Sequence, residues 1–281
     1  MKQKVKAISV CIIAILVLVI AQMVAMTLGT VFTILGLPEY VEAVTDAITY
    51  PIFTILGLKL LVEKVFKYSL NDFGVKKLRF KWYWVAIGLL LPVFVIGLFQ
   101  FVDGGWVIYN TDMGNKLLIV FWGVLYYSLA AGIVEEMIFR GVIMGVLKKE
   151  FNLPIAIGVP SVLFGLVHII GNSLDLISII QLVIAGTFVG VMFSLIGYQS
   201  DNFWNNAIVH AFWNMSTIGL CHIGLEVSEN SLFTYVINTK SMIISGGDFG
   251  IESSVFAIAG YSIVSIISLI MIKKKRDITL K

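Results

Sequence analysis

The sequence predicts an all-α membrane protein with about eight transmembrane helices. Hydrophobic residues make up 59% of the chain and charged residues only 13%, whereas soluble domains carry about 25% charged residues. The mean hydropathy is +0.97. The apolar residues are gathered into long runs, and a helix needs roughly 20 of them to cross a hydrocarbon core about 30 Å thick. These observations favour a polytopic protein embedded in a lipid bilayer.

Eight apolar segments follow one another along the chain. The first has a basic tip like that of a signal peptide, but it runs for about 29 residues without an A-x-A cleavage site. We therefore expect it to remain as a membrane helix. The eight expected spans are 7–35, 47–62, 82–102, 117–146, 154–170, 174–196, 203–225 and 253–272.

The cationic residues predict the orientation of these spans, because cytoplasmic loops collect lysine and arginine. With the N-terminus inside, 17 of the 20 cations lie in inner segments and the outer segments are acidic. An odd number of spans would put a basic cluster on the wrong side, so both termini are expected in the cytoplasm. The inner cations are Lys2, Lys4, Lys6, Lys64, Lys67, Lys76, Lys77, Arg79, Lys81, Arg140, Lys148, Lys149, Lys273, Lys274, Lys275, Arg276 and Lys281. The net charge of +3 thus reflects membrane orientation, and no nucleic-acid partner is expected.

Two adjacent glutamates, Glu135 and Glu136, lie in the middle of the fourth span. A carboxylate at bilayer depth is unfavourable unless it is paired, so residues kept there usually serve a function. Glu136 and Arg140 are four residues apart, in the order that favours an ion pair on one helical face. Glu135 points about 100° away from its neighbour and is therefore the candidate for chemistry.

Glu135 and His168 are predicted to meet across a helical hairpin. Each lies about sixteen residues from the midpoint of the expected turn at 149–153, and residues equidistant from such a turn lie at the same height. Phe164 precedes His168 by one helical turn and can pack over its ring.

A further pair, His210 and Asn214, presents an imidazole and an amide on one face of the seventh span. Together with Glu135 and His168, the pair could polarise a water molecule and stabilise an oxyanion, as peptide hydrolysis requires. Each polar residue also has a simpler interpretation, since histidine and asparagine often form hydrogen bonds between membrane helices. Packing alone explains their joint occurrence poorly.

The ordered motifs E-E-x-x-x-R, F-x-x-x-H and H-x-x-x-N resemble those of the CPBP family of intramembrane proteases, also called the Abi or CAAX protease family. This family includes the Ras-converting type of prenyl protease and bacteriocin-processing and self-immunity proteins. The resemblance implies an eight-helix endopeptidase whose cavity opens toward the cytoplasm and the lipid, and we expect it in a prokaryotic plasma membrane. The motif positions are filled by Glu135, Glu136, Arg140, Phe164, His168, His210 and Asn214.

The resemblance also implies a role for each catalytic position. Glu135 would activate the attacking water together with His168. The tetrahedral oxyanion would be stabilised by His210 and Asn214. Glu136 would orient the site or assist the base, and its ion-pair partner would hold it in place.

A metal-free mechanism without a cofactor is favoured, because the sequence contains no H-E-x-x-H motif and the carboxylate and imidazole suffice to activate water. Zinc is the alternative cofactor, with Glu135, His168 and His210 as its ligands. Cys11 and Cys221 lie in separate apolar segments and have no metal-binding spacing.

The expected substrate is a membrane-embedded or lipid-modified peptide or protein, such as a prenylated C-terminus or a peptide precursor. The alternative function is that of a non-catalytic bacteriocin-immunity or scaffold protein. A proton-coupled transporter with a relay through Glu135 and His168 is less favoured, because the paired repeats typical of transporters are not found.

The chain is interpreted as three parts. Residues 1–116 form a transmembrane scaffold of about three helices, and residues 117–225 form the catalytic core. Residues 226–281 hold an outer loop, the last transmembrane helix and a basic cytoplasmic tail. The stretch 226–252 is polar enough to be mobile.

Overall fold

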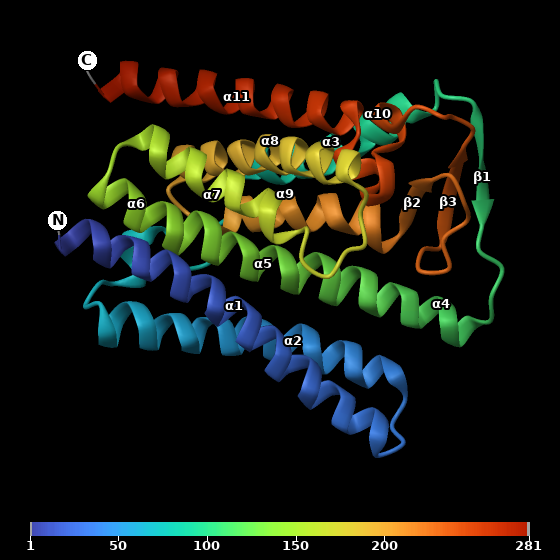
Figure 1. The fold of residues 1–281 in the computed structure, drawn as a ribbon, viewed down its shortest axis with the longest axis horizontal. Helices are drawn as coiled ribbons and strands as arrows, with labels where there is room; N and C mark the ends of the chain where they lie inside the picture. The colour runs from blue at the N-terminus through green and yellow to red at the C-terminus, as the bar shows by residue number, and fades with distance from the viewer. Residues whose placement is uncertain (1, 280–281) are drawn as a thin grey trace.

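The computed structural model describes residues 2–279 as an elongated bundle of helices (Figure 1). Lys281, assigned above to the last basic cluster, lies outside the described residues. The helices are α1 (Lys2–Ile34), α2 (Glu39–Leu58), α3 (Trp82–Phe99), α4 (Met113–Val120), α5 (Ala131–Glu136), α6 (Met144–Glu150), α7 (Leu153–Val167), α8 (Leu176–Ser200), α9 (Trp204–Asn214), α10 (Met242–Ser245) and α11 (Val255–Thr279). The all-α prediction is confirmed.

Irregular helical turns extend or join several of these helices. The π-helical segments are Lys59–Val65, Phe121–Ala130, Met137–Ile143 and Met215–Gly219. The 3-10 helices are Leu70–Phe73, Gly247–Phe249 and Ile251–Ser253. As a result, α4, α5 and α6 form one long helical element from Met113 to Glu150, which passes through the middle of the bundle (Figure 1).

Within residues 2–279, six helical elements are long and apolar enough to cross a bilayer. They are Lys2–Ile34, Glu39–Val65, Trp82–Phe99, Met113–Glu150, Leu176–Ser200 and Val255–Asp277. The chain is therefore an integral membrane protein. The other two expected spans correspond to the shorter helices α7 and α9, so eight crossings remain a prediction. The start of α1 and the end of α11 lie at the same end of the bundle (Figure 1), which fits an even number of crossings.

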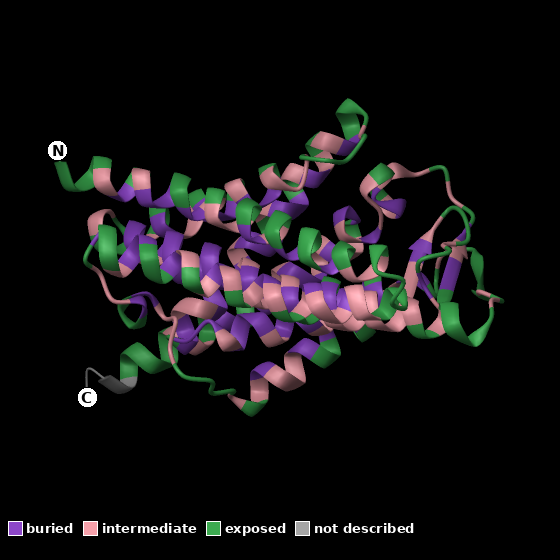
Figure 2. Cartoon of the chain, turned by 90° about the horizontal axis from the view of Figure 1, so that it is seen from below, coloured by how far each residue is buried: buried purple, intermediate pink, exposed green. Residues whose placement is uncertain are grey.

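The distribution of buried and exposed residues also fits a membrane-embedded helical bundle. The buried residues are concentrated inside the bundle, and exposed residues alternate with them along the peripheral helices (Figure 2). Many of the exposed side chains are large and apolar, such as Ile20 and Met23 on α1 and Ile266 on α11. Exposed apolar surface of this extent is expected on helices that face lipid.

The seventh expected span is shorter than the predicted range 203–225. Its helix ends at Gly219, and Cys221–Gly224 forms strand β2. Glycine is a poor helix former, and the strand gains main-chain pairing in a small sheet at the end opposite the termini (Figure 1). There β3 (Phe233–Ile237) pairs in parallel with β2 and antiparallel with β1 (Gly104–Ile108). This sheet and α10 give regular structure to part of the stretch 226–252, which was expected to be mobile.

Small residues bring α7 close to α8. A Cβ atom added to Gly186 would lie 2.5 Å from the Cα atom of Gly165, and one added to Gly190 would lie 2.6 Å from the Cα atom of Ser161. Small residues allow membrane helices to approach closely. This packing fixes the end of α7, directly before His168, against α8.

Candidate active site

The candidate catalytic residues line one cavity of about 450 Å³ inside the bundle. Glu135 lies on α5, His168 directly follows α7, and His210 and Asn214 lie on α9. His210 and Asn214 are buried, while the Glu135 side chain is 20% exposed. The structure thus brings together four residues that are widely separated in the sequence.

The predicted ion pair between Glu136 and Arg140 is present. Arg140 Nη1 donates to Glu136 Oε1 at 2.8 Å, and both side chains are fully buried. Nη2 donates to the carbonyl oxygen of Gly190 at 3.3 Å. The guanidinium carbon lies 4.4 Å from the centre of the Phe164 ring and 5.1 Å from that of Phe193. Two aromatic rings and a main-chain oxygen therefore fix the cation that neutralises Glu136.

Glu136 also holds His210, a contact that the sequence analysis missed. His210 Nδ1 lies 2.9 Å from Glu136 Oε1, and the ring stacks on Phe193 at 4.8 Å between centres. With Nδ1–H donating to the carboxylate, the other ring nitrogen, Nε2, faces Glu135 Oε2 at 4.0 Å. Glu136 thus contacts both Arg140 and the imidazole of His210.

Glu135 and His168 share the cavity, but the polar contact recorded for Glu135 is with His210. Within residues 2–279, Glu135 Oε2 is buried without a hydrogen-bond partner. His168 Nδ1 lies 2.7 Å from the carbonyl oxygen of Phe164 and donates to it, so Nε2 is the nitrogen that can accept a hydrogen bond. The Phe164 ring lies 4.6 Å from the imidazole, as the i,i+4 spacing predicted.

Asn214 is tied to a π-helical part of the long central helix. Its Nδ2 atom donates to the carbonyl oxygen of Tyr127 at 2.8 Å, and Tyr127 also lines the cavity. A side-chain amide has two N–H groups, so one stays available for another acceptor. Such π-helical turns are frequent at functional sites.

Glu252 lines the same cavity and was not found by the sequence analysis. It lies in the 3-10 helix Ile251–Ser253, and its Oε1 atom accepts a hydrogen bond from Trp213 Nε1 at 2.7 Å. No spacing rule connects it to the three motifs, because only tertiary packing places it beside α9. Trp213 is next to Asn214 in the sequence, but this does not identify Glu252 as its hydrogen-bond partner.

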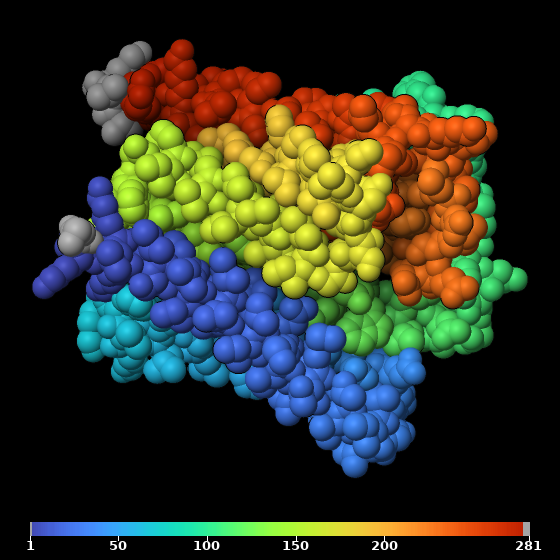
Figure 3. All heavy atoms as spheres, in the orientation of Figure 1, coloured from blue at the N-terminus to red at the C-terminus, as the bar shows by residue number. Residues whose placement is uncertain are grey.

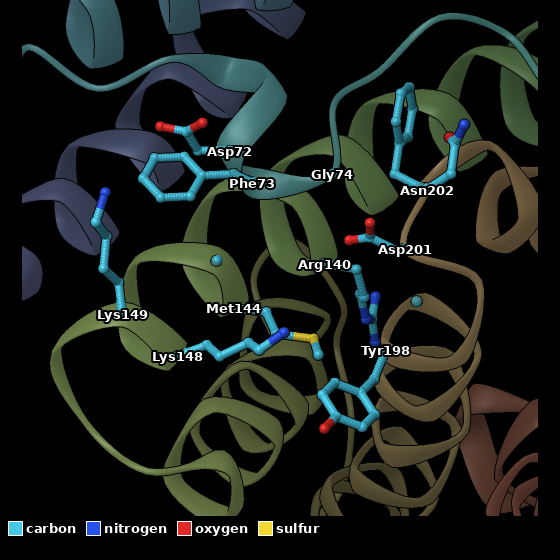
Figure 4. Close-up of a pocket in the computed structure, with 13 residues that line it drawn as sticks. Asp72, Phe73, Gly74, Arg140, Met144, Lys148, Lys149, Tyr198, Asp201 and Asn202 are labelled. Atoms are coloured by element: carbon cyan, nitrogen blue, oxygen red, sulfur yellow. The ribbon is translucent and has the colours of Figure 1, made fainter. Parts of the chain in front are cut away.

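A second cavity, of about 280 Å³, lies at the basic end of the bundle and is lined in part by Arg140 (Figure 4). Lys148 and Asp201 also line it. Their charges are already engaged, since Lys148 lies 4.7 Å from the centre of the Tyr198 ring and Asp201 pairs with Lys76 at 2.5 Å. The candidate catalytic groups face the other cavity.

The fold and the central cavity define a polytopic membrane protein with a carboxylate, two imidazoles and an amide around one buried space. Residues 116–216 match a family model described as Type II CAAX prenyl endopeptidase Rce1-like. This range contains every motif residue, so over these residues the chain is similar to the CAAX protease family. Neither the curated proteins nor the solved structures gave a match.

Proposed function

We propose that this protein is an intramembrane endopeptidase that cleaves membrane-associated or lipid-modified peptides. The observation that carries the proposal is the convergence of Glu135, His168, His210 and Asn214 on one cavity, within the range matched by the protease family model. The basic end of the bundle is assigned to the cytoplasm. The direct test is cleavage of a library of quenched membrane peptides, including prenylated ones, by the purified protein and by its Glu135→Ala variant.

Water activation is assigned to Glu135 and His168. Glu135 has a buried oxygen that lacks a hydrogen-bond partner in the described part of the chain, and His168 Nε2 can accept a hydrogen bond because Nδ1 donates to Phe164. A water molecule between them would give a proton to the carboxylate as it attacks the peptide carbonyl. General-base catalysis of this kind contributes about a hundredfold to ten-thousandfold in rate.

Oxyanion stabilisation is assigned to His210 and Asn214. Because Glu136 accepts the Nδ1 proton of His210, Nε2 can donate to an oxyanion only when the ring carries both protons. Asn214 donates one amide hydrogen to Tyr127 and has a second for the substrate. Removing one such donor typically raises the barrier by roughly 2.7 to 4 kcal/mol.

Hydrolysis of the peptide bond by a zinc-bound water is the competing mechanism. In the region that the structure describes, no three His, Cys, Asp or Glu side chains converge closely enough to hold a metal ion, so no step is assigned to a metal. We expect protein stripped by a strong chelator, and shown to be metal-free by elemental analysis, to keep cleaving a quenched farnesylated CAAX peptide. Inactivation reversed by stoichiometric zinc but not by magnesium would instead make Glu135, His168 and His210 ligands.

A further inference from the structure

Glu252 brings a further carboxylate into the cavity from outside the range of the family match. It lies in the short 3-10 helix before α11, and its side chain lines the cavity together with Glu135. The Trp213 indole donates to Oε1 at 2.7 Å. Among residues 2–279, this is the one hydrogen bond recorded for the carboxyl group, so the second oxygen is left for a molecule in the cavity.

The segment that carries Glu252 is fixed to the bundle by main-chain contacts. Gln181 on α8 donates to the carbonyl oxygens of Met242 and Ser253 at 2.8 and 2.9 Å. The Tyr261 hydroxyl on α11 donates to the Glu252 carbonyl oxygen at 3.3 Å. These contacts hold the main chain at Glu252 from two helices, which limits the positions open to its side chain, as a reacting group requires.

The α7–α8 loop lies beside this segment and completes the same wall of the cavity. The main-chain N–H of Asp175 donates to Asp248 Oδ2 at 3.0 Å, and the His168 and Phe249 rings lie 6.1 Å apart. The two segments meet on the surface shown in Figure 3. Glu252 therefore approaches the cavity on the side where His168 lies.

The groups around Glu252 come from four helices. They are Glu135 from α5, His168 from the end of α7, His210 from α9 and Tyr261 from α11. Burial raises the pKa of the Glu252 carboxyl group, and the charge of Glu135 adds to this effect, whereas the Trp213 hydrogen bond and the two histidines lower it. Burial dominates, so Glu252 keeps its proton to a higher pH than an exposed glutamate does. Two carboxyl groups in different environments can divide acid and base roles.

We infer that Glu252 is the general acid that protonates the leaving amine, while Glu135 acts as the base. The inference rests on the proposed protease function. In the first step, water gives a proton to Glu135 and its oxygen bonds to the peptide carbon. In the second step, the C–N bond breaks while the nitrogen takes the Glu252 proton. The products are a carboxylic acid and an amine, and transfer of the Glu135 proton to Glu252 restores both groups.

The test compares a quenched peptide amide with an activated aryl ester of the same acyl sequence. An amine leaves only with a proton, whereas a phenolate needs none. We expect Glu252→Gln to lower kcat/KM for the amide about a hundredfold and for the ester by less than about threefold.

In the unaltered protein, amide hydrolysis should decline at alkaline pH as Glu252 ionises, and this decline should be absent in Glu252→Gln. Glu226→Gln, which changes an exposed carboxylate of the preceding loop, is the matched control.

Equal losses on amide and ester would overturn the inference, because they would indicate that Glu252 only supports Trp213. If Glu252→Gln does not fold, the inference is tested instead on the unaltered protein with a series of anilide substrates. Proton donation predicts a weak dependence of rate on the basicity of the leaving aniline, and a steep dependence would contradict it. A wild-type protein that cleaves neither substrate overturns the proposed function and this inference together, whereas equal losses with an active wild type overturn the inference alone.

Discussion

Replacing Glu135 with glutamine is expected to lower peptide hydrolysis by at least about a hundredfold while leaving the protein folded. Glutamine has nearly the same shape but cannot take a proton from water. The buried Oε2 atom of Glu135 has no hydrogen-bond partner in residues 2–279, so the substitution breaks no structural hydrogen bond there. The measurement is kcat/KM on a quenched farnesylated peptide, with thermal unfolding recorded on the same preparation.

Glu39→Gln serves as the control for this substitution, because Glu39 is an exposed glutamate at the start of α2. It should cleave the peptide at the wild-type rate. Near-normal hydrolysis by Glu135→Gln would remove Glu135 from the base role. A large drop in its unfolding temperature would assign the lost activity to folding instead.

Arg140→Ala is expected to destabilise the protein by roughly 3 to 5 kcal/mol, as removing one partner of a buried ion pair does. The substitution leaves Glu136 charged in a buried setting and removes the hydrogen bond to Gly190. Activity should fall as well, because Glu136 positions His210. Folded yield and chemical unfolding in detergent measure the effect.

The double variant Arg140→Ala with Glu136→Gln separates the effect on stability from the effect on activity. It removes the uncompensated charge, so much of the lost stability should return. Activity should stay low, because a neutral amide replaces the carboxylate that accepts from His210 Nδ1. An Arg140→Ala protein with wild-type thermal stability would show that the ion pair is not needed for folding.

The parts of the fold that depend on local sequence could be predicted. Long apolar runs have the length of a membrane helix, so the sequence located α1, α3, α8 and α11 closely. The contact between Glu136 and Arg140 follows from their spacing on one helix, as does the packing of Phe164 over His168. The positions of all three motifs could be predicted from the types of their residues and the order of the motifs along the chain.

The contacts between elements could not be predicted in the same way. The hairpin rule placed Glu135 level with His168, but it assumes regular helices on both sides of the turn. Here the π-helical turn Met137–Ile143 changes the register of one side, and α7 ends at Val167, just before the histidine. The two residues line one cavity, yet the imidazole next to Glu135 is that of His210. Glu252 depends entirely on tertiary packing and has no local signal.

The central claim is that water attacks the peptide bond in this cavity. The most direct test is to run the cleavage in water enriched in a heavy oxygen isotope and to analyse the products by mass spectrometry. Metal-free wild-type protein should place one heavy oxygen atom in the new carboxyl group of a farnesylated peptide. Glu135→Gln at the same concentration should give almost no labelled product. Labelled product formed by Glu135→Gln at the wild-type rate would contradict hydrolysis through Glu135, and cleavage by the wild type without incorporated label would contradict attack by water.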